Sequence, residues 1–148
     1  MVGWGVVRHE GHRIAPVGHG TVAPGRALPY PERLRAIFEG VRDRIAEHAP
    51  DVVAVEQVFS GKNVATAMKI GEGRAVVLLA AALAGIPIAE YSPAVVKKAV
   101  VGSGAAHKSQ VGEMVRIVLG LAETPTPDDA SDALAIAICH CHRREPLR

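Results

Sequence analysis

Asp51-Val52-Val53-Ala54-Val55-Glu56 is the stretch of sequence that decides the fold. It is a short, almost continuous apolar run that ends in an acid, and such runs are typical of strands buried on both faces of a parallel sheet. The alanine-rich segment at 63–84 predicts a long helix, and a second short strand is expected at 86–89. Because this helix is apolar nearly all round, we expect it to be buried on more than one side. Alternation of strand and helix predicts an α/β fold.

The segments on either side of this unit complete the expected domain. Two strand-like runs at 3–8 and 13–22 are separated by a turn that contains Gly11, which favours a hairpin. Apolar residues three and four apart at 32–48 predict an amphipathic helix. Further helices are predicted at 93–101, 108–119 and 128–142. We therefore expect one domain over residues 1–148, with a mixed sheet flanked by helices and its antiparallel and parallel parts at opposite sides.

The composition is that of a globular protein. The chain has 148 residues, of which 49% are hydrophobic and 22% are charged, which excludes a disordered or collagen-like protein. No apolar run reaches the ~20 residues that a membrane helix needs, and we see no secretory signal. Cys139 and Cys141 are too close in sequence to be expected to bridge, which favours a reducing cytoplasm as the location.

The formal net charge of +2 is unevenly distributed along the chain. Residues 57–120 hold seven lysines and arginines against three glutamates, whereas the rest of the chain holds ten basic and twelve acidic residues. A basic middle segment permits a polyanionic partner.

Three acidic residues are the strongest chemical signal. Glu56 ends a buried strand, where ligands of open α/β sheets usually bind. Asp129 and Asp132 stand three apart on one face of a helix. Each acid alone has an ordinary explanation as a helix cap or a solvated side chain. Together, clustered carboxylates suit Mg²⁺, and two such ions would hold a phosphodiester in line with an attacking water.

Several motifs give the sequence a family resemblance. They are Glu56-Gln57-Val58-Phe59, Lys62-Asn63, Ala89-Glu90-Tyr91-Ser92-Pro93, the stretch from Lys97 to Gly104, Lys108-Ser109-Gln110-Val111 and the stretch from Pro127 to Ala137. In order and spacing they strongly resemble the RuvC family of crossover-junction endodeoxyribonucleases, from Gly3 to His142. The resemblance implies an RNase H-like fold, a homodimer and Mg²⁺-dependent symmetric nicking of four-way DNA junctions in recombination and repair.

The resemblance also assigns catalytic roles to particular residues. Glu56, Asp129 and Asp132 are expected to bind the metal and to be catalytic. Lys108 is expected to join them, because it opens a helix after a glycine-rich turn and is well placed to stabilise phosphate charge. The implied cofactor is a pair of Mg²⁺ ions per active site, for which Mn²⁺ would substitute.

A second group of residues is expected to contact DNA. Phe59 resembles the aromatic residue that stacks on a junction base in this family, although a core phenylalanine is the ordinary alternative. The expected DNA-binding lysines are Lys62, Lys97, Lys98 and Lys108. The alanine-rich helix after Asn63 matches the segment that builds the family's dimer interface. Branch-migration motor proteins of the same pathway are further expected partners.

The family's first strand is expected to be absent from this chain. In the family, a strand ending in Gly-Ile-Asp-Pro-Gly precedes the element that matches Gly3-Trp4-Gly5-Val6, and it carries a catalytic aspartate. We expect its loss to leave out the central strand of the sheet and to unpair backbone groups, each of which costs roughly 1–3 kcal/mol when buried. We therefore expect the chain to be a poor or inactive nuclease.

Two other interpretations stay open. A non-catalytic junction-binding module would keep the basic segment and would bind DNA without cleavage, with an affinity that falls steeply with salt. The run Cys139-His140-Cys141-His142 suggests a zinc site. Structural zinc sites, however, usually space their cysteines two to four apart and add distant partners. The histidines also suit a helix C-terminus, where they complement the helix dipole.

Overall fold

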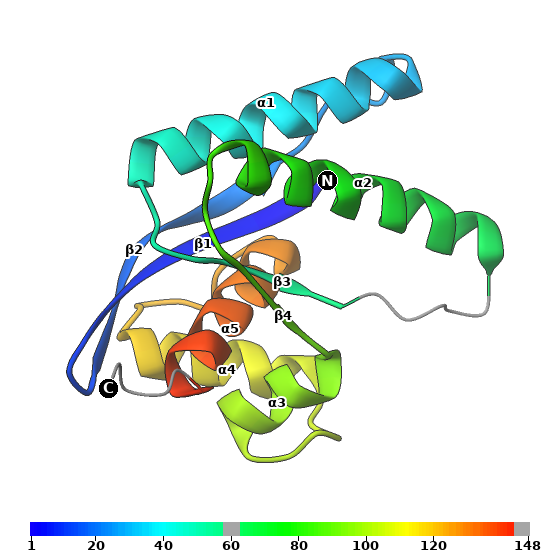
Figure 1. Cartoon of the computed structure of the whole chain (residues 1–148). Coiled ribbons are helices and arrows are strands. Elements are labelled where there is room, and N and C mark those ends of the chain that lie inside the picture. The colour runs from blue at the N-terminus through cyan, green and yellow to red at the C-terminus, as the bar shows by residue number, and fades with distance from the viewer. Residues whose placement is uncertain (58–62, 144–148) are drawn as a thin grey trace.

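Strands and helices follow one another in the order that the sequence predicts (Figure 1). The structure is a computed structural model of the chain that describes residues 1–57 and 63–143. The elements are β1 (Val2–Glu10), β2 (Arg13–Val22), α1 (Tyr30–His48), β3 (Val53–Glu56), α2 (Val64–Leu83), β4 (Ile88–Tyr91), α3 (Pro93–Val101), α4 (Lys108–Leu119) and α5 (Asp128–Arg143). The α/β class and every predicted element are confirmed, with shifts of a few residues at some ends.

The described strands form two pairs. β1 and β2 make an antiparallel hairpin that turns at Gly11, whose φ of +60° is open to glycine without strain. β3 and β4 run parallel, with Val53 opposite Ile88 and Glu56 opposite Tyr91. The antiparallel and the parallel parts of the expected mixed sheet are therefore both present. Within residues 1–57 and 63–143, however, the two pairs are separate ladders that share no strand.

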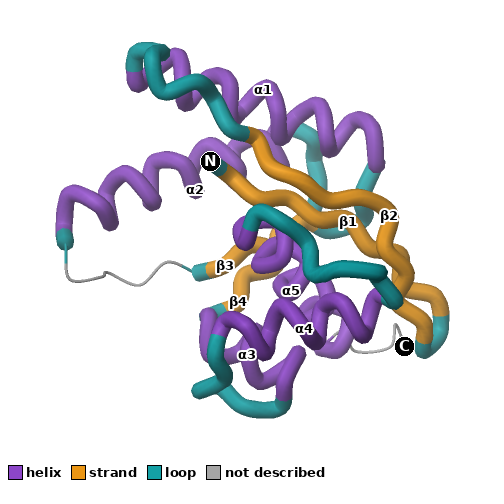
Figure 2. The backbone as a smooth tube through the Cα atoms, turned by 180° about the vertical axis from the view of Figure 1, so that it is seen from behind, coloured by secondary structure: helices purple, strands orange, loops and turns teal. Residues whose placement is uncertain are grey.

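Helix α5 packs against both strand pairs and holds them in one structure. It contacts β1, β2 and β3 on one side and α3 and α4 on the other (Figure 2). Leu134 and Ile138 of α5 are fully buried, as is Val115 of α4. Because these side chains are removed from water on all sides, they supply the largest share of hydrophobic stabilisation per residue. The main core therefore lies around α5.

Two glycines let β1 approach α5 very closely. A Cβ atom added at Gly3 would lie 1.9 Å from the carbonyl oxygen of Asp129. One added at Gly5 would lie 2.7 Å from the side chain of Leu134. Only a residue without a side chain fits at these positions. The backbone of β1 thus fixes the position of the first turns of α5.

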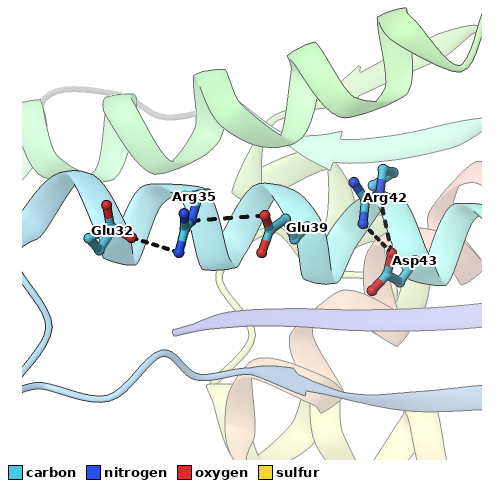
Figure 3. Close-up of polar contacts among 5 residues, drawn as sticks. All are labelled: Glu32, Arg35, Glu39, Arg42 and Asp43. Atoms are coloured by element: carbon cyan, nitrogen blue, oxygen red, sulfur yellow. Dashed lines mark hydrogen bonds and ion pairs between the residues drawn. The ribbon is translucent and has the colours of Figure 1, made fainter.

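Helices α1 and α2 form a second, smaller core with the start of β1. Ile37 and Val41 of α1 pack with Ala80 of α2. The opposite face of α1 is exposed and carries ion pairs (Figure 3). Arg35 lies 2.8 Å from Glu32 and 3.9 Å from Glu39. Such exposed pairs contribute little to stability, so substitutions at these positions are suitable controls.

The prediction that α2 is buried on more than one side is wrong for the single chain. Its buried residues are Ala80 and Ala81. Val64, Met68 and Leu83 are 76%, 62% and 70% exposed, and the N-terminal end of α2 projects beyond α1 (Figure 1). A largely apolar helix indicates that something covers it but does not indicate which chain does so. None of the described helices is long and apolar enough to cross a membrane.

Candidate active site

The C-terminal end of β3 lies near the first turns of α5. Glu56 is the last residue of β3, and its side chain is exposed. Partial desolvation raises the pKa of Glu56, and the negative charge of Asp132 raises it further. The positive charges of Lys97 and Lys108 act on Glu56 in the opposite direction. Four predicted site residues from β3, α3, α4 and α5 are therefore close enough to interact.

Lys108 connects α4 to the acidic end of α5. Its Nζ atom lies 3.0 Å from Oδ2 of Asp132 and 3.5 Å from Oδ2 of Asp128. The hydrogen bond to Asp132 is the main cause that raises the pKa of Lys108, so the side chain stays protonated. All three side chains are exposed, so the pairs are screened by water and add little to stability. Their effect is to hold an ammonium group between two carboxylates.

The remaining predicted residues are placed differently. Asp129 lies in the first turn of α5, where it is exposed and its backbone rests against Gly3. Lys98 is exposed in the last turn of α3, and nothing in the described residues joins it to the acidic cluster. Phe59 and Lys62 lie outside the described residues.

A metal ion at this site would bind to carboxylate oxygens. Across residues 1–57 and 63–143, no group of three or more histidine, cysteine, aspartate or glutamate side chains is arranged to hold an ion. Mg²⁺ is usually held by one or two carboxylates, with waters and substrate phosphate in the other positions. Carboxylates such as those of Glu56 and Asp132 are suitable ligands for such an ion. The two-ion arrangement that the sequence suggests is not assembled by the described residues.

The histidines of the Cys-His-Cys-His run form hydrogen bonds between α5 and the neighbouring elements β4 and α3. Cys139 and Cys141 are buried in the core and are not joined by a disulfide. Nδ1 of His140 is hydrogen-bonded to the Tyr91 hydroxyl at 2.7 Å, and Nδ1 of His142 lies 3.1 Å from the carbonyl oxygen of Ala99. These contacts join the end of α5 to β4 and α3, which gives the histidines a structural role.

Two residues at the site were missed by the sequence analysis. Asp128 begins α5, and its carboxylate contacts Lys108. Arg74 of α2 donates a hydrogen bond from Nε to the carbonyl oxygen of Glu56 at 3.2 Å and pairs with Glu90 of β4. No spacing signal could have found Arg74, because it stands 18 residues from Glu56 on another element. In the sequence it is only one of the basic residues of the middle segment.

Comparison with known proteins decides the family. The model of the family "Crossover junction endodeoxyribonuclease RuvC" matches residues 1–140. The chain belongs to the RuvC family. A protein named crossover junction endodeoxyribonuclease RuvC from Chloroflexus aggregans is 50% identical over 147 residues, which cover 99% of this chain and 90% of that protein. The RuvC of Maricaulis maris is 50% identical over 143 residues, which cover 97% of this chain and 85% of the relative.

Solved RuvC structures have the same fold. The Thermus thermophilus RuvC structure superposes with a TM-score of 0.86 at 38% identity and covers 95% of this chain and 86% of that one. Thermus thermophilus RuvC in complex with Holliday junction substrate gives a TM-score of 0.84 at 35% identity, over 93% and 84% of the two chains. The expected fold and enzyme class, a phosphodiester hydrolase, are thereby confirmed.

The RuvC comparisons leave two expectations without support. The absence of the family's first strand is not confirmed, since the matches span nearly the whole chain and most of the length of the relatives. The strand β1, which begins at Val2, is part of the matched region. The relatives are named as endonucleases, so a module that binds junctions without cleaving them is not favoured.

Proposed function

We propose that this chain nicks four-way DNA junctions by hydrolysis of a phosphodiester in each of two symmetric strands. The observation that carries the proposal is the 3.0 Å contact between Lys108 and Asp132, whose charges both act on Glu56 at the end of β3. Acidic oxygens beside a protonated amine suit a reaction in which a phosphate gains negative charge. The solved complex of a RuvC with a Holliday junction supports the choice of substrate.

The proposal includes a divalent cation, and we propose Mg²⁺ with Mn²⁺ as its substitute. Glu56 and Asp132 would hold it, and Asp129, in the same acidic turn of α5, is the further acid that we propose to take part. When bound, such an ion lowers the pKa of a water molecule and stabilises charge on the phosphate. The chain itself supplies the Lys108 ammonium, which is exposed and therefore within reach of a phosphate oxygen. Asp132 keeps that ammonium in place.

The proposed DNA surface extends from this site over α3 and the start of α4. Lys97 and Lys98 lie on α3, and Lys108 opens α4, whose N-terminal dipole favours an anion. Phe59 and Lys62, outside the described residues, complete the proposed set. A contact made through phosphates predicts that junction affinity falls steeply with salt. Branch-migration motor proteins remain predicted partners.

A labelled junction assay tests the proposed function. With excess protein and Mg²⁺, we expect the chain to nick a four-way junction in symmetry-related strands and to leave a linear duplex of the same sequence intact. We expect a low rate, because no group of three or more metal-ligating side chains is assembled within residues 1–57 and 63–143. Chelation of the ion should stop the reaction. Tight binding with no cleavage in Mg²⁺ or Mn²⁺ would instead indicate a binding-only module, and equal cutting of the duplex would contradict junction specificity.

We further propose that α2 forms the interface of a homodimer. Its exposed apolar side chains include Val64, Met68 and Leu83, and soluble monomers rarely expose a long stripe of this kind. Substituting Met68 with aspartate is expected to raise the dimer dissociation constant at least about tenfold, because a charge would enter an apolar interface. Sedimentation velocity measures the change. Ile117→Asp is the matched control, since Ile117 is 54% exposed on α4. An equal effect of both substitutions would argue against α2 as the interface.

A further inference from the structure

Arg74 reaches from α2 to the end of the strand that carries Glu56. Its Nε–H donates to the carbonyl oxygen of Glu56 at 3.2 Å, and its guanidinium pairs with the Glu90 carboxylate on β4. The Arg74 side chain is only 24% exposed. We propose that Arg74 is a positioning residue that fixes Glu56 for the reaction, an inference that rests on the proposed nuclease function.

The strand register explains why Glu56 needs this support. Val53 donates its N–H to Pro87 at 3.0 Å, and Gln57 donates its N–H to Tyr91 at 2.8 Å. Alternate residues of β3 therefore face β4 with their backbone groups, and Glu56, one position before Gln57, faces the opposite edge. On that edge, within the part of the chain that the structure describes, β3 pairs with no other strand. The guanidinium of Arg74 supplies the donor that a neighbouring strand would otherwise provide.

Glu90 keeps Arg74 in the position that this contact requires. It stands opposite Val55 in the β3–β4 ladder, one residue before the end of the pair. Its carboxylate accepts a hydrogen bond from one terminal nitrogen of the Arg74 guanidinium, while Nε of Arg74 donates to the carbonyl oxygen of Glu56. The planar, forked guanidinium can make both contacts at once, which a lysine ammonium on its flexible stem does less well. Both contacts involve a charged group, which makes them stronger than neutral hydrogen bonds.

The acidic residues of the proposed site lie on the opposite face of the C-terminal end of β3. Glu56 lies opposite Tyr91 in the ladder, and paired residues in a sheet share a face. The Tyr91 hydroxyl is hydrogen-bonded to His140 of α5, and the negative charge of Asp132 of α5 raises the pKa of Glu56. Arg74 thus holds the backbone of Glu56 from the α2 side while its carboxylate faces α5. Since α2 is also the proposed dimer helix, the same helix links the interface to the acidic site.

The test compares four variants of the full chain: Arg74→Gln, Arg74→Lys, Glu90→Gln and the control Arg35→Gln, whose arginine makes exposed ion pairs on α1. Each is assayed for single-turnover nicking in Mg²⁺, junction affinity, Mn²⁺ affinity by electron paramagnetic resonance, and melting temperature. We expect Arg74→Gln to lower the nicking rate and the Mn²⁺ affinity by about 10- to 100-fold, as loss of partners that orient a ligand does. Junction affinity should not change. Arg74→Lys should recover part of the loss, Glu90→Gln should show a smaller loss, and Arg35→Gln should match the unsubstituted chain.

Three results would overturn the inference. The first is an Arg74→Gln variant with an unchanged nicking rate and Mn²⁺ affinity. The second is a loss that follows melting temperature and junction affinity in equal measure, which indicates a purely structural role. The third applies if Arg74→Gln fails to fold. The test then rests on Arg74→Lys and Glu90→Gln, and a normal nicking rate and Mn²⁺ affinity in both variants would contradict the proposal. If the unsubstituted chain never nicks junctions, the proposed function is contradicted. The Mn²⁺ affinities of the variants then still test whether Arg74 positions Glu56.

Discussion

Substituting Glu56 with glutamine is expected to lower the rate of junction nicking at least about a hundredfold and to leave junction affinity unchanged. Removal of residues that merely orient a metal ligand already costs 10- to 100-fold, so loss of a proposed ligand should cost at least the upper end of that range. The amide has nearly the shape of the carboxylate, so the fold should persist. Single-turnover cleavage of a labelled junction in excess protein measures the rate, and a binding titration measures the affinity.

Two companion substitutions make this result interpretable. Asp132→Asn should reproduce the loss, and it also removes the negative charge that pairs with Lys108 at 3.0 Å. Glu39→Gln is the matched control, because Glu39 is an exposed glutamate on α1 (Figure 3). Nicking at the normal rate by Glu56→Gln would place the chemistry away from the end of β3.

Gly3→Ala is expected to destabilise the chain by at least about 3 kcal/mol, at the upper end of the usual cost of overpacking. The new Cβ atom would lie 1.9 Å from the carbonyl oxygen of Asp129, and this neighbour is backbone that cannot rotate aside. Either β1 or the first turn of α5 must move, and the second outcome would displace the acidic residues as well. Urea unfolding followed by circular dichroism measures the loss of stability, and nicking should fall in parallel.

Gly25→Ala is the control for this substitution. A Cβ atom at Gly25 meets nothing within 4 Å, and this glycine is not among those with positive φ. Its free energy of unfolding should therefore change by no more than about 0.5 kcal/mol, as for most surface substitutions. Equal unfolding midpoints for Gly3→Ala and the unsubstituted chain would mean that β1 does not approach α5 as closely as the structure has it.

Local patterns in the sequence predict the elements of this fold well, because each pattern reflects a local cause. The apolar run at 51–56 became β3, and the turn at Gly11 became the hairpin of β1 and β2. The environment of α2 could not be predicted in this way. Its largely apolar composition is the same whether neighbouring helices or a second chain cover it, so composition alone cannot distinguish the two.

In the candidate site, too, the features with a local cause could be predicted and those that depend on packing could not. Glu56 and Asp132 could be proposed from sequence, because a strand end and a helix face indicate where side chains point. Their approach to each other depends on how α5 crosses β3, which no local pattern encodes. Arg74 could not be found at all, since its partner is a backbone carbonyl on another element. Asp129 remains a predicted site residue on the strength of the resemblance.

The separate ladders of β1–β2 and β3–β4 determine where this protein can be altered. A two-stranded sheet is marginal on its own, so each pair depends on the helix that packs against it. α5 contacts both pairs, and a change in its buried face would therefore release both from the core together. The hairpin tip at Gly11 is the opposite case, because it is exposed and has open space around it. Tags and inserted segments belong at that tip, and α5 is the element to leave untouched.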